Sequence, residues 1–182
     1  MINENELPQN WKIVKVGDIC DVVRGGSPRP AGDPRYYGGH IPFLKVADLT
    51  KDSNVYLQTY QYTIKEAGLH KTRRTQPNTL LLTNSGATLG VPKICMIDAT
   101  FNDGIAAFLN LEPRSNLYLY YFWLTKTKSL RNINQGAAQP NLNTDMALLH
   151  KSAIFSFLFF ARLQLCNFQA FPSVSSDLRR HT

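Results

Sequence analysis

The sequence predicts a domain of the α/β (α+β) class, built on a curved, mainly antiparallel sheet with a few helices. Its 182 residues are enough for one buried core, and a composition of 43% hydrophobic and 18% charged residues is typical of a globular protein. Several short apolar segments are separated by glycine-bearing turns and not by long helices, which favours such a sheet.

The first half of the sequence contains strand candidates on both sides of a long loop. Residues 11–23 begin as a strand and then continue as a short helix or turn. Glycine and proline recur so densely from residue 25 to residue 39 that regular structure is excluded, which predicts a loop. Residues 41–49 are expected to form a strand, and residues 63–68 a short helix.

The second half supplies three more strand candidates and the clearest helix. Residues 80–83, 91–97 and 106–111 are short apolar segments separated by turns. Leucine and tyrosine then recur at helical spacing, which predicts a helix that is capped by Asn116 and ends at Arg131.

The composition changes abruptly after Lys151. Residues 152–182 contain no lysine or glutamate, yet they hold the aromatic run of residues 154–160. The sequence therefore predicts a domain over residues 1–151 and an atypical tail over residues 152–182. The apolar run in this tail is far shorter than the roughly 20 residues that span a bilayer, so no membrane is expected as a partner.

Charge and cysteine usage narrow the class of protein. The formal net charge of +7 favours a polyanionic partner, with nucleic acid as the first candidate, although an excess charge that only aids solubility is the alternative. Cys20, Cys95 and Cys166 are far apart and are expected to be reduced thiols in the core. Residues 1–10 are polar and unlike a secretory signal, so a cytoplasmic protein is expected.

No pattern for catalysis, a metal ion or a cofactor is found in the sequence. Residues 86–90 are rich in glycine but lack the Lys-Ser/Thr ending of a phosphate-binding loop. Ser85 lacks the glycine that precedes a hydrolase nucleophile, because Thr83 stands there. The four histidines are not at metal-ligand spacing. The sequence therefore predicts a binding protein and not an enzyme.

Four polar loops carry side chains that are suited to DNA, at residues 24–35, 71–76, 83–88 and 135–143. The alternatives are a solvated connector for the first, a solvated charged face for the second and a helix cap within the fourth. The DNA-binding residues expected from these loops and their neighbouring strands are Arg24, Ser27, Arg29, Lys45, Lys71, Arg73, Arg74, Asn84, Ser85, Thr88, Lys93, Gln135, Gln139 and Asn141.

The order of short motifs resembles one target recognition domain of a type I restriction-modification specificity subunit. The resemblance covers roughly residues 7–151 and is specific as a combination, although each motif alone is weak. The motifs are LPQNW at 7–11, VGDI at 16–19, GSP at 26–28, IPFLKV at 41–46, SGATLG at 85–90 and QPNLN at 139–143.

This resemblance implies an α/β globule with a curved sheet that reads one half of a split double-stranded DNA site, followed by a long spacer helix. It implies as partners the modification (methyltransferase) subunits, which methylate adenine with S-adenosylmethionine, and the restriction subunits, which translocate and cut DNA. The loops at 85–90 and 139–143 are expected near DNA or in the framework of its binding face. The alternative is a scaffold that docks modification subunits and contacts DNA only non-specifically.

The tail over residues 152–182 departs from the family, which continues with an apolar, proline-containing segment and an amphipathic helix rich in Glu, Gln and Lys. A frameshift, a truncated gene or a cloned fragment would explain the departure. We expect the coding DNA, translated in its other frames, to encode such a helix after residue 151, and its absence there would count against this explanation.

Overall fold

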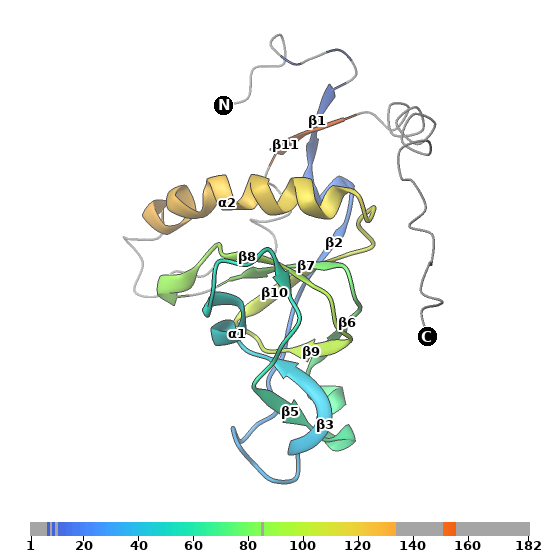
Figure 1. The fold of residues 1–182 in the computed structure, drawn as a ribbon, viewed down its shortest axis with the longest axis vertical. Coiled ribbons are helices and arrows are strands. Elements are labelled where there is room, and N and C mark those ends of the chain that lie inside the picture. The colour runs from blue at the N-terminus through green and yellow to red at the C-terminus, as the bar shows by residue number, and fades with distance from the viewer. Residues whose placement is uncertain (1–6, 8, 10, 85, 134–150, 156–182) are drawn as a thin grey trace, which may run out of the picture. The chain divides into compact units, whose positions relative to one another are not determined.

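The structure is a computed structural model, shown as a ribbon in Figure 1, and it describes residues 7, 9, 11–84, 86–133 and 151–155. The chain separates into two compact units, one of Lys15–Ser152 and one of Met1–Val14 with Ala153–Thr182. The predicted division into residues 1–151 and 152–182 stays a prediction. Strands β1 (Trp11–Lys15) and β11 (Lys151–Phe155) form a two-stranded sheet.

The larger sheet of the Lys15–Ser152 unit has five strands in the order β2-β10-β7-β8-β4. Its long members pair antiparallel, while the short β4 runs parallel to β8. These strands are β2 (Asp21–Arg24), β4 (Tyr56–Leu57), β7 (Thr79–Thr83), β8 (Pro92–Cys95) and β10 (Ile105–Leu109). The predicted strands at 80–83, 91–97 and 106–111 are thus confirmed as β7, β8 and β10.

A second sheet has four strands in the order β5-β3-β9-β6. β3 pairs antiparallel with β5 and parallel with β9, and β6 pairs antiparallel with β9. Its strands are β3 (Tyr37–Leu44), β5 (Tyr62–Ile64), β6 (Arg73–Thr75) and β9 (Ala99–Phe101). The mainly antiparallel α+β fold is confirmed, with its strands divided between sheets.

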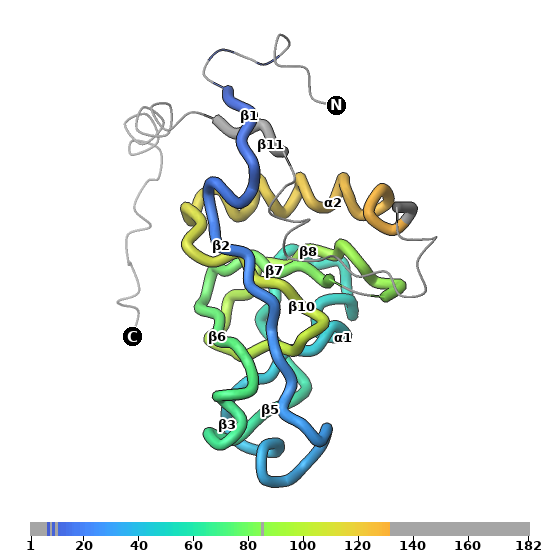
Figure 2. The backbone as a smooth tube through the Cα atoms, turned by 180° about the vertical axis from the view of Figure 1, so that it is seen from behind, coloured from blue at the N-terminus to red at the C-terminus, as the bar shows by residue number. Residues whose placement is uncertain are grey.

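The long helix α2 (Ser115–Ile133) lies across β7 and β8, as both views show (Figure 1; Figure 2). Trp123 is fully buried, and its ring lies 5.7 Å from that of Phe108 on β10. Leu119 and Leu130 are buried in the same core. The predicted helix is confirmed, and its apolar side is the one that the five-stranded sheet covers.

The start of α2 differs from the prediction. The carboxylate of Glu112 accepts the backbone N–H groups of Arg114 at 2.9 Å and Ser115 at 3.1 Å, which caps the helix. Asn116 lies inside the first turn, where its side chain donates to the carbonyl of Asn78 at 2.6 Å. Glu112 and not Asn116 therefore supplies the cap.

The five-stranded sheet is buried on both faces. All residues of β7 are buried, and successive side chains point to opposite faces. Leu80 and Leu82 belong to the core beneath α2. Leu81 belongs instead to a core with Phe101 and Leu44 of the four-stranded sheet. The uninterrupted apolar run of β7 is typical of a strand covered on both sides.

The short elements correct several predicted boundaries. The predicted strand at 41–49 ends at Leu44, because the Asp48 carboxylate accepts the N–H of Lys45 at 2.8 Å and caps a helix there. The predicted helix at 63–68 is shifted toward the C-terminus, because residues 62–64 form β5 and the helical turn η3 begins at Glu66. The short helix predicted after the first strand is present as η2, and the chain then forms the strand β2. The elements concerned are η2 (Val16–Asp18), α1 (Val46–Thr50), η3 (Glu66–Lys71) and η4 (Gly86–Thr88).

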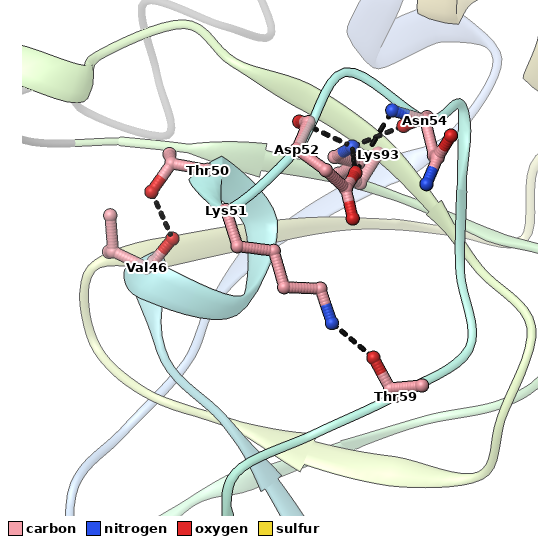
Figure 3. Close-up of polar contacts among 7 residues, drawn as sticks. All are labelled: Val46, Thr50, Lys51, Asp52, Asn54, Thr59 and Lys93. Carbon is pink, nitrogen blue, oxygen red and sulfur yellow. Dashed lines mark hydrogen bonds and ion pairs between the residues drawn. The ribbon is translucent and has the colours of Figure 1, made fainter.

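Lys93 on β8 is buried, and its ammonium group lies against the loop that follows α1 (Figure 3). It donates to the carbonyl of Asp52 at 3.0 Å and to its carboxylate at 2.8 Å, and also to the carbonyl of Asn54. Because a buried charge is costly without such partners, Lys93 fastens this loop to the sheet. The carboxylate of Asp52 also accepts the N–H of Asn54 at 2.9 Å.

These contacts predict a pH-dependent contribution to stability. The hydrogen bond from Lys93, followed by that from the N–H of Asn54, lowers the pKa of Asp52 below its ordinary value of 3.8. A carboxyl group whose pKa is lower in the folded chain stabilises it above the unfolded pKa and loses this effect as the pH falls through the folded pKa. We expect Asp52→Asn to lower the free energy of unfolding at neutral pH, with a deficit that shrinks below pH 3.8.

Urea unfolding at a series of pH values measures this deficit. Asp98→Asn is the matched control, because Asp98 is exposed and its side chain makes no hydrogen bond or ion pair with another residue in the described ranges. A deficit for Asp52→Asn that stays constant across the acid range would contradict the proposed role of the Lys93 contact.

Candidate nucleic-acid interface

The turn between β9 and β10, residues 102–104, is called here the Asp103 turn. β2 and β7 both run antiparallel to β10, with Arg24 opposite Ala106 and Thr83 opposite Ile105. The last residues of β2 and β7 therefore lie beside the first residues of β10. The topology of the five-stranded sheet thus brings two predicted loops to one turn.

Strands of the four-stranded sheet reach the same turn from its other side. Phe101, the last residue of β9, lies opposite Leu44 at the end of β3 and opposite Arg73 at the start of β6. Lys45 follows Leu44 directly, and the N–H of Asn102 donates to the carbonyl of Leu44 at 3.0 Å. The predicted residues Lys45 and Arg73 are therefore neighbours of the Asp103 turn through the backbone pairing.

The loop after β2 is tied to Asp103 by side chains. Arg24 donates through Nε to the carbonyl of Asp103 at 2.7 Å, and the Ser27 hydroxyl donates to its carboxylate at 2.6 Å. Nη2 of Arg29 lies 3.8 Å from the other carboxylate oxygen. Three predicted DNA-binding residues thus gather around one acidic residue that the sequence analysis had not selected as a site.

Two glycines allow the same loop to approach β9 and η3 closely. Gly25 and Gly26 donate their N–H groups to the carbonyls of Ile105 at 3.0 Å and Phe101 at 3.1 Å. A Cβ on Gly25 would lie 2.3 Å from the carbonyl oxygen of Asn102, and one on Gly26 would lie 2.4 Å from that of Lys71. Only glycine fits such backbone contacts, so the loop is held by its main chain.

The predicted basic cluster lies beside this loop. Lys71 ends η3, and its Nζ lies 5.2 Å from the centre of the Tyr36 ring. Arg73 and Arg74 are exposed on β6, an edge strand of the four-stranded sheet. In the part of the chain that the structure describes, neither arginine has a hydrogen bond or ion pair from its side chain. Their guanidinium groups are therefore available to an anionic partner.

Other polar groups of the long loop are already paired. Arg35 forms a bidentate contact with Asp33, with its closest distance at 2.6 Å, and that hydrogen bond lowers the pKa of Asp33. The Tyr37 hydroxyl donates to the carbonyl of Pro28 at 2.8 Å. Burial raises the pKa of Tyr37, with Arg29 opposing the rise and Asp103 adding to it, so the hydroxyl keeps its proton.

Lys45 and Thr88 are half-buried and have defined surroundings. The ammonium of Lys45 lies 3.4 Å from the centre of the Tyr62 ring, a cation–π contact. Thr88 belongs to a loop fastened to α2, since Thr127 donates to the carbonyl of Gly90 at 2.6 Å. The structure therefore brings Lys45 toward the Asp103 turn and ties the Thr88 loop to the helix.

Two predicted DNA contacts are wrong because the side chains are buried. Lys93 is 2% exposed and its ammonium is taken up by the loop after α1. Asn84 is 1% exposed and donates to the carbonyl of Asp103 at 3.2 Å, so it supports the turn from within. The other predicted residues, Ser85, Gln135, Gln139 and Asn141, lie outside the described residues.

Sequence reasoning missed Asp103 as a partner of the loop after β2. The dipeptide Asp103-Gly104 between two apolar segments is a signal for a tight turn, and it locates the turn itself. It does not identify Arg24 or Ser27 as partners, because they are 79 and 76 residues away in the sequence. The Lys45–Tyr62 contact was missed for the same reason.

A surface cavity of about 460 Å³ opens beside β6 and the start of α2, with Arg74, Asn78, Asn110 and Asn116 in its lining. Within the described ranges, no group of three or more His, Cys, Asp or Glu side chains could hold a metal ion. No helix there is long and apolar enough to cross a membrane.

Cys20 and Cys95 are free thiols in the core, as predicted, and Cys166 lies outside the described residues. Burial, followed by the charge of Asp21, raises the pKa of Cys20 to about 12. Burial also raises the pKa of Cys95, to about 11. Both thiols therefore stay protonated at neutral pH.

The contact of Gly25 with β9 predicts a large cost for any side chain there. We expect Gly25→Ala to lower the free energy of unfolding by about 3 kcal/mol, the upper end of the range for overpacking, because its Cβ would overlap two backbone carbonyl oxygens. Gly32→Ala is the matched comparison, since Gly32 has a positive φ but open space around it, and its cost should be about 1 kcal/mol. Chemical denaturation measures both, and equal costs would argue against the close contact.

Comparison with known proteins finds two specificity subunits among the relatives of this chain. The type I restriction enzyme MjaIX specificity subunit of Methanocaldococcus jannaschii is 32% identical over 143 residues, which cover 75% of this chain and 32% of that protein. The HindI specificity subunit of Haemophilus influenzae is 22% identical over 141 residues, covering 76% and 30%. The chain thus spans about a third of the length of the curated relatives that it matches.

Solved structures share the fold. The HsdS subunit from Thermoanaerobacter tengcongensis superposes with a TM-score of 0.59 at 20% identity, over 88% of this chain and 37% of that one. A chain from a study of type I R-M complex assembly and conformational transition reaches 0.68 at 17% identity, over 88% and 38%. The sequence pattern of the family described as "Type I restriction modification DNA specificity domain" matches residues 8–146. Since that match covers most of the chain, this protein belongs to the type I restriction-modification DNA specificity domain family.

Proposed function

We propose that the Lys15–Ser152 unit is a DNA-recognition module that reads one half of a bipartite double-stranded DNA target. One observation carries the proposal: the loop after β2 and the basic segment Lys71–Arg74 meet beside the Asp103 turn. Their close backbone contact at Gly26 makes them one surface. The cationic side chains on it are Arg24, Arg29, Lys71, Arg73 and Arg74.

The two segments have different tasks in this proposal. Arg73 and Arg74 stand on a strand, are exposed and lack carboxylate partners among the described residues, which suits contacts with phosphates. Arg29 stands on a loop that projects from the sheet and is 71% exposed, which suits contact with a base edge such as guanine. Phosphate contacts fix the register, and base contacts supply the specificity.

The proposed activity is binding and not catalysis, with no cofactor of its own. The relatives are specificity subunits of type I restriction enzymes. We therefore propose that this chain directs adenine methylation or DNA cleavage by modification and restriction subunits, in the cytoplasm. Ser85, Thr88, Gln135, Gln139 and Asn141 remain proposed DNA contacts.

Selection from a randomised duplex pool tests the function directly. We expect the purified chain to enrich a short motif, and its affinity for that motif to fall steeply with salt, because bound phosphates release counterions. Salt-sensitive binding without enrichment would contradict half-site reading and support the alternative of a scaffold with non-specific DNA contact. No binding at either of two salt concentrations would overturn the proposal.

The basic segment has its own prediction. For the double variant Arg73→Ala, Arg74→Ala, the slope of log K against log salt should be smaller by about 2, since each lost phosphate contact removes about 0.9. Lys126→Ala, Lys128→Ala removes the same charge from α2 and should leave the slope nearly unchanged. Titrations of the enriched duplex measure both slopes, and equal effects of the two variants would exclude a specific role for β6.

A further inference from the structure

An acidic side chain lies in the middle of the proposed DNA-binding surface. Asp103 is half-exposed, with 43% of its side chain accessible. A carboxylate at such a place repels phosphates and weakens DNA binding, so we expect Asp103 to have another role, through a contact that favours binding. Its contacts indicate what that role is.

The carbonyl of Asp103 holds Arg24 at the end of β2, and its carboxylate holds residues of the loop that follows. Its carbonyl oxygen accepts from Nε of Arg24 at 2.7 Å, and its carboxylate accepts from the hydroxyl of Ser27 at 2.6 Å. The second carboxylate oxygen faces Nη2 of Arg29 at 3.8 Å. The buried side chain of Asn84 donates to the same carbonyl at 3.2 Å.

The position of Asp103 is itself fixed from both sides. The N–H of Asn102 donates to Leu44 at 3.0 Å, and the N–H of Asn84 donates to the carbonyl of Gly104 at 3.0 Å. A Cβ on Gly104 would lie 2.6 Å from the side chain of Val46. The turn therefore has little freedom to move, and Asp103 is a rigid support for the loop.

The arginines that Asp103 holds keep most of their donors. A guanidinium group has five N–H donors, and Asp103 faces Arg29 through Nη2. Arg24 uses Nε, which leaves its terminal nitrogens. An arginine that is oriented before binding loses less side-chain entropy when it contacts a base.

We propose that Asp103 is a positioning residue for base recognition, which orients Arg29 for contact with a base edge and holds Ser27 and Arg24 beside it. This inference rests on the proposed function and adds a specificity determinant to it. The carboxylate weakens general attraction to DNA and sharpens the choice between sequences.

Asp103→Asn is the most informative substitution. Asparagine keeps the size of the side chain and an oxygen that accepts from Ser27, but it removes the negative charge that faces Arg29. Asp98→Asn is the matched control, because it makes the same chemical change at an exposed turn between β8 and β9. The two variants change the net charge equally.

The first measurement is the ratio of affinities for the enriched duplex and a scrambled duplex. We expect Asp103→Asn to lower this ratio at least about fivefold, which is the lower limit of the effect of losing one bidentate base contact. The affinity for the scrambled duplex should not fall. Asp98→Asn should leave the ratio unchanged. In an Arg29→Ala background, Asp103→Asn should change the ratio less than about twofold, because the residue through which it acts is gone.

The second measurement needs no DNA. The heteronuclear ¹⁵N NOE of the Arg29 Nε–H reports the order of this side chain on the fast timescale. We expect it to fall in Asp103→Asn and to stay the same in Asp98→Asn. If the native chain enriches no motif, the proposed function fails, while this measurement still decides whether Asp103 orders Arg29.

Three results would overturn the inference. One is an unchanged NOE of Arg29 in Asp103→Asn. Another is an equal rise in affinity for both duplexes, which would make Asp103 a simple source of repulsion. The last is an equal loss of affinity for both duplexes together with a lower free energy of unfolding, which would make its role only structural.

Discussion

The five-stranded sheet must be covered on both faces, because β7 and β10 carry apolar side chains on each side. α2 covers one face, and the four-stranded sheet shares a core with the other. β9 and β10 are consecutive strands in different sheets. The chain therefore crosses from one sheet to the other within residues 102–104, and this crossing is where the loops of both sheets meet. The position of the candidate interface therefore follows from the packing of the two sheets against each other.

Much of the fold could be predicted where local sequence determines structure. β7, β8 and β10 are apolar runs between turns, and α2 has a clear helical period. The strands β4, β6 and β9 were missed, because two or three residues carry no readable period and are strands only through their partners. The predicted strand at 41–49 was too long because its end depends on the carboxylate of Asp48, which the pattern of apolar residues does not register.

The sequence identified the cationic residues of the candidate site but did not identify Asp103, which contacts them. Ser27 and Arg29 stand in a loop whose glycines and prolines are visible in the sequence, Arg24 ends the strand before it, and the structure ties all three to one turn. Lys93 and Asn84 were wrong because burial depends on contacts between distant segments. A lysine between apolar residues gives no sign of whether its ammonium faces solvent or a loop from elsewhere in the chain.

The loop after β2 is attached through main-chain hydrogen bonds of Gly25 and Gly26, which do not depend on the side chains that follow. The backbone conformation of this loop and the side chains that it exposes therefore depend on different residues. If Ser27 and Arg29 contact DNA as proposed, substitutions at these two positions would change the DNA preference while the main-chain attachment of the loop at Gly25 and Gly26 stays in place. The same separation makes these positions a compact target for combinatorial libraries, in which the two glycines stay fixed and the neighbouring side chains vary.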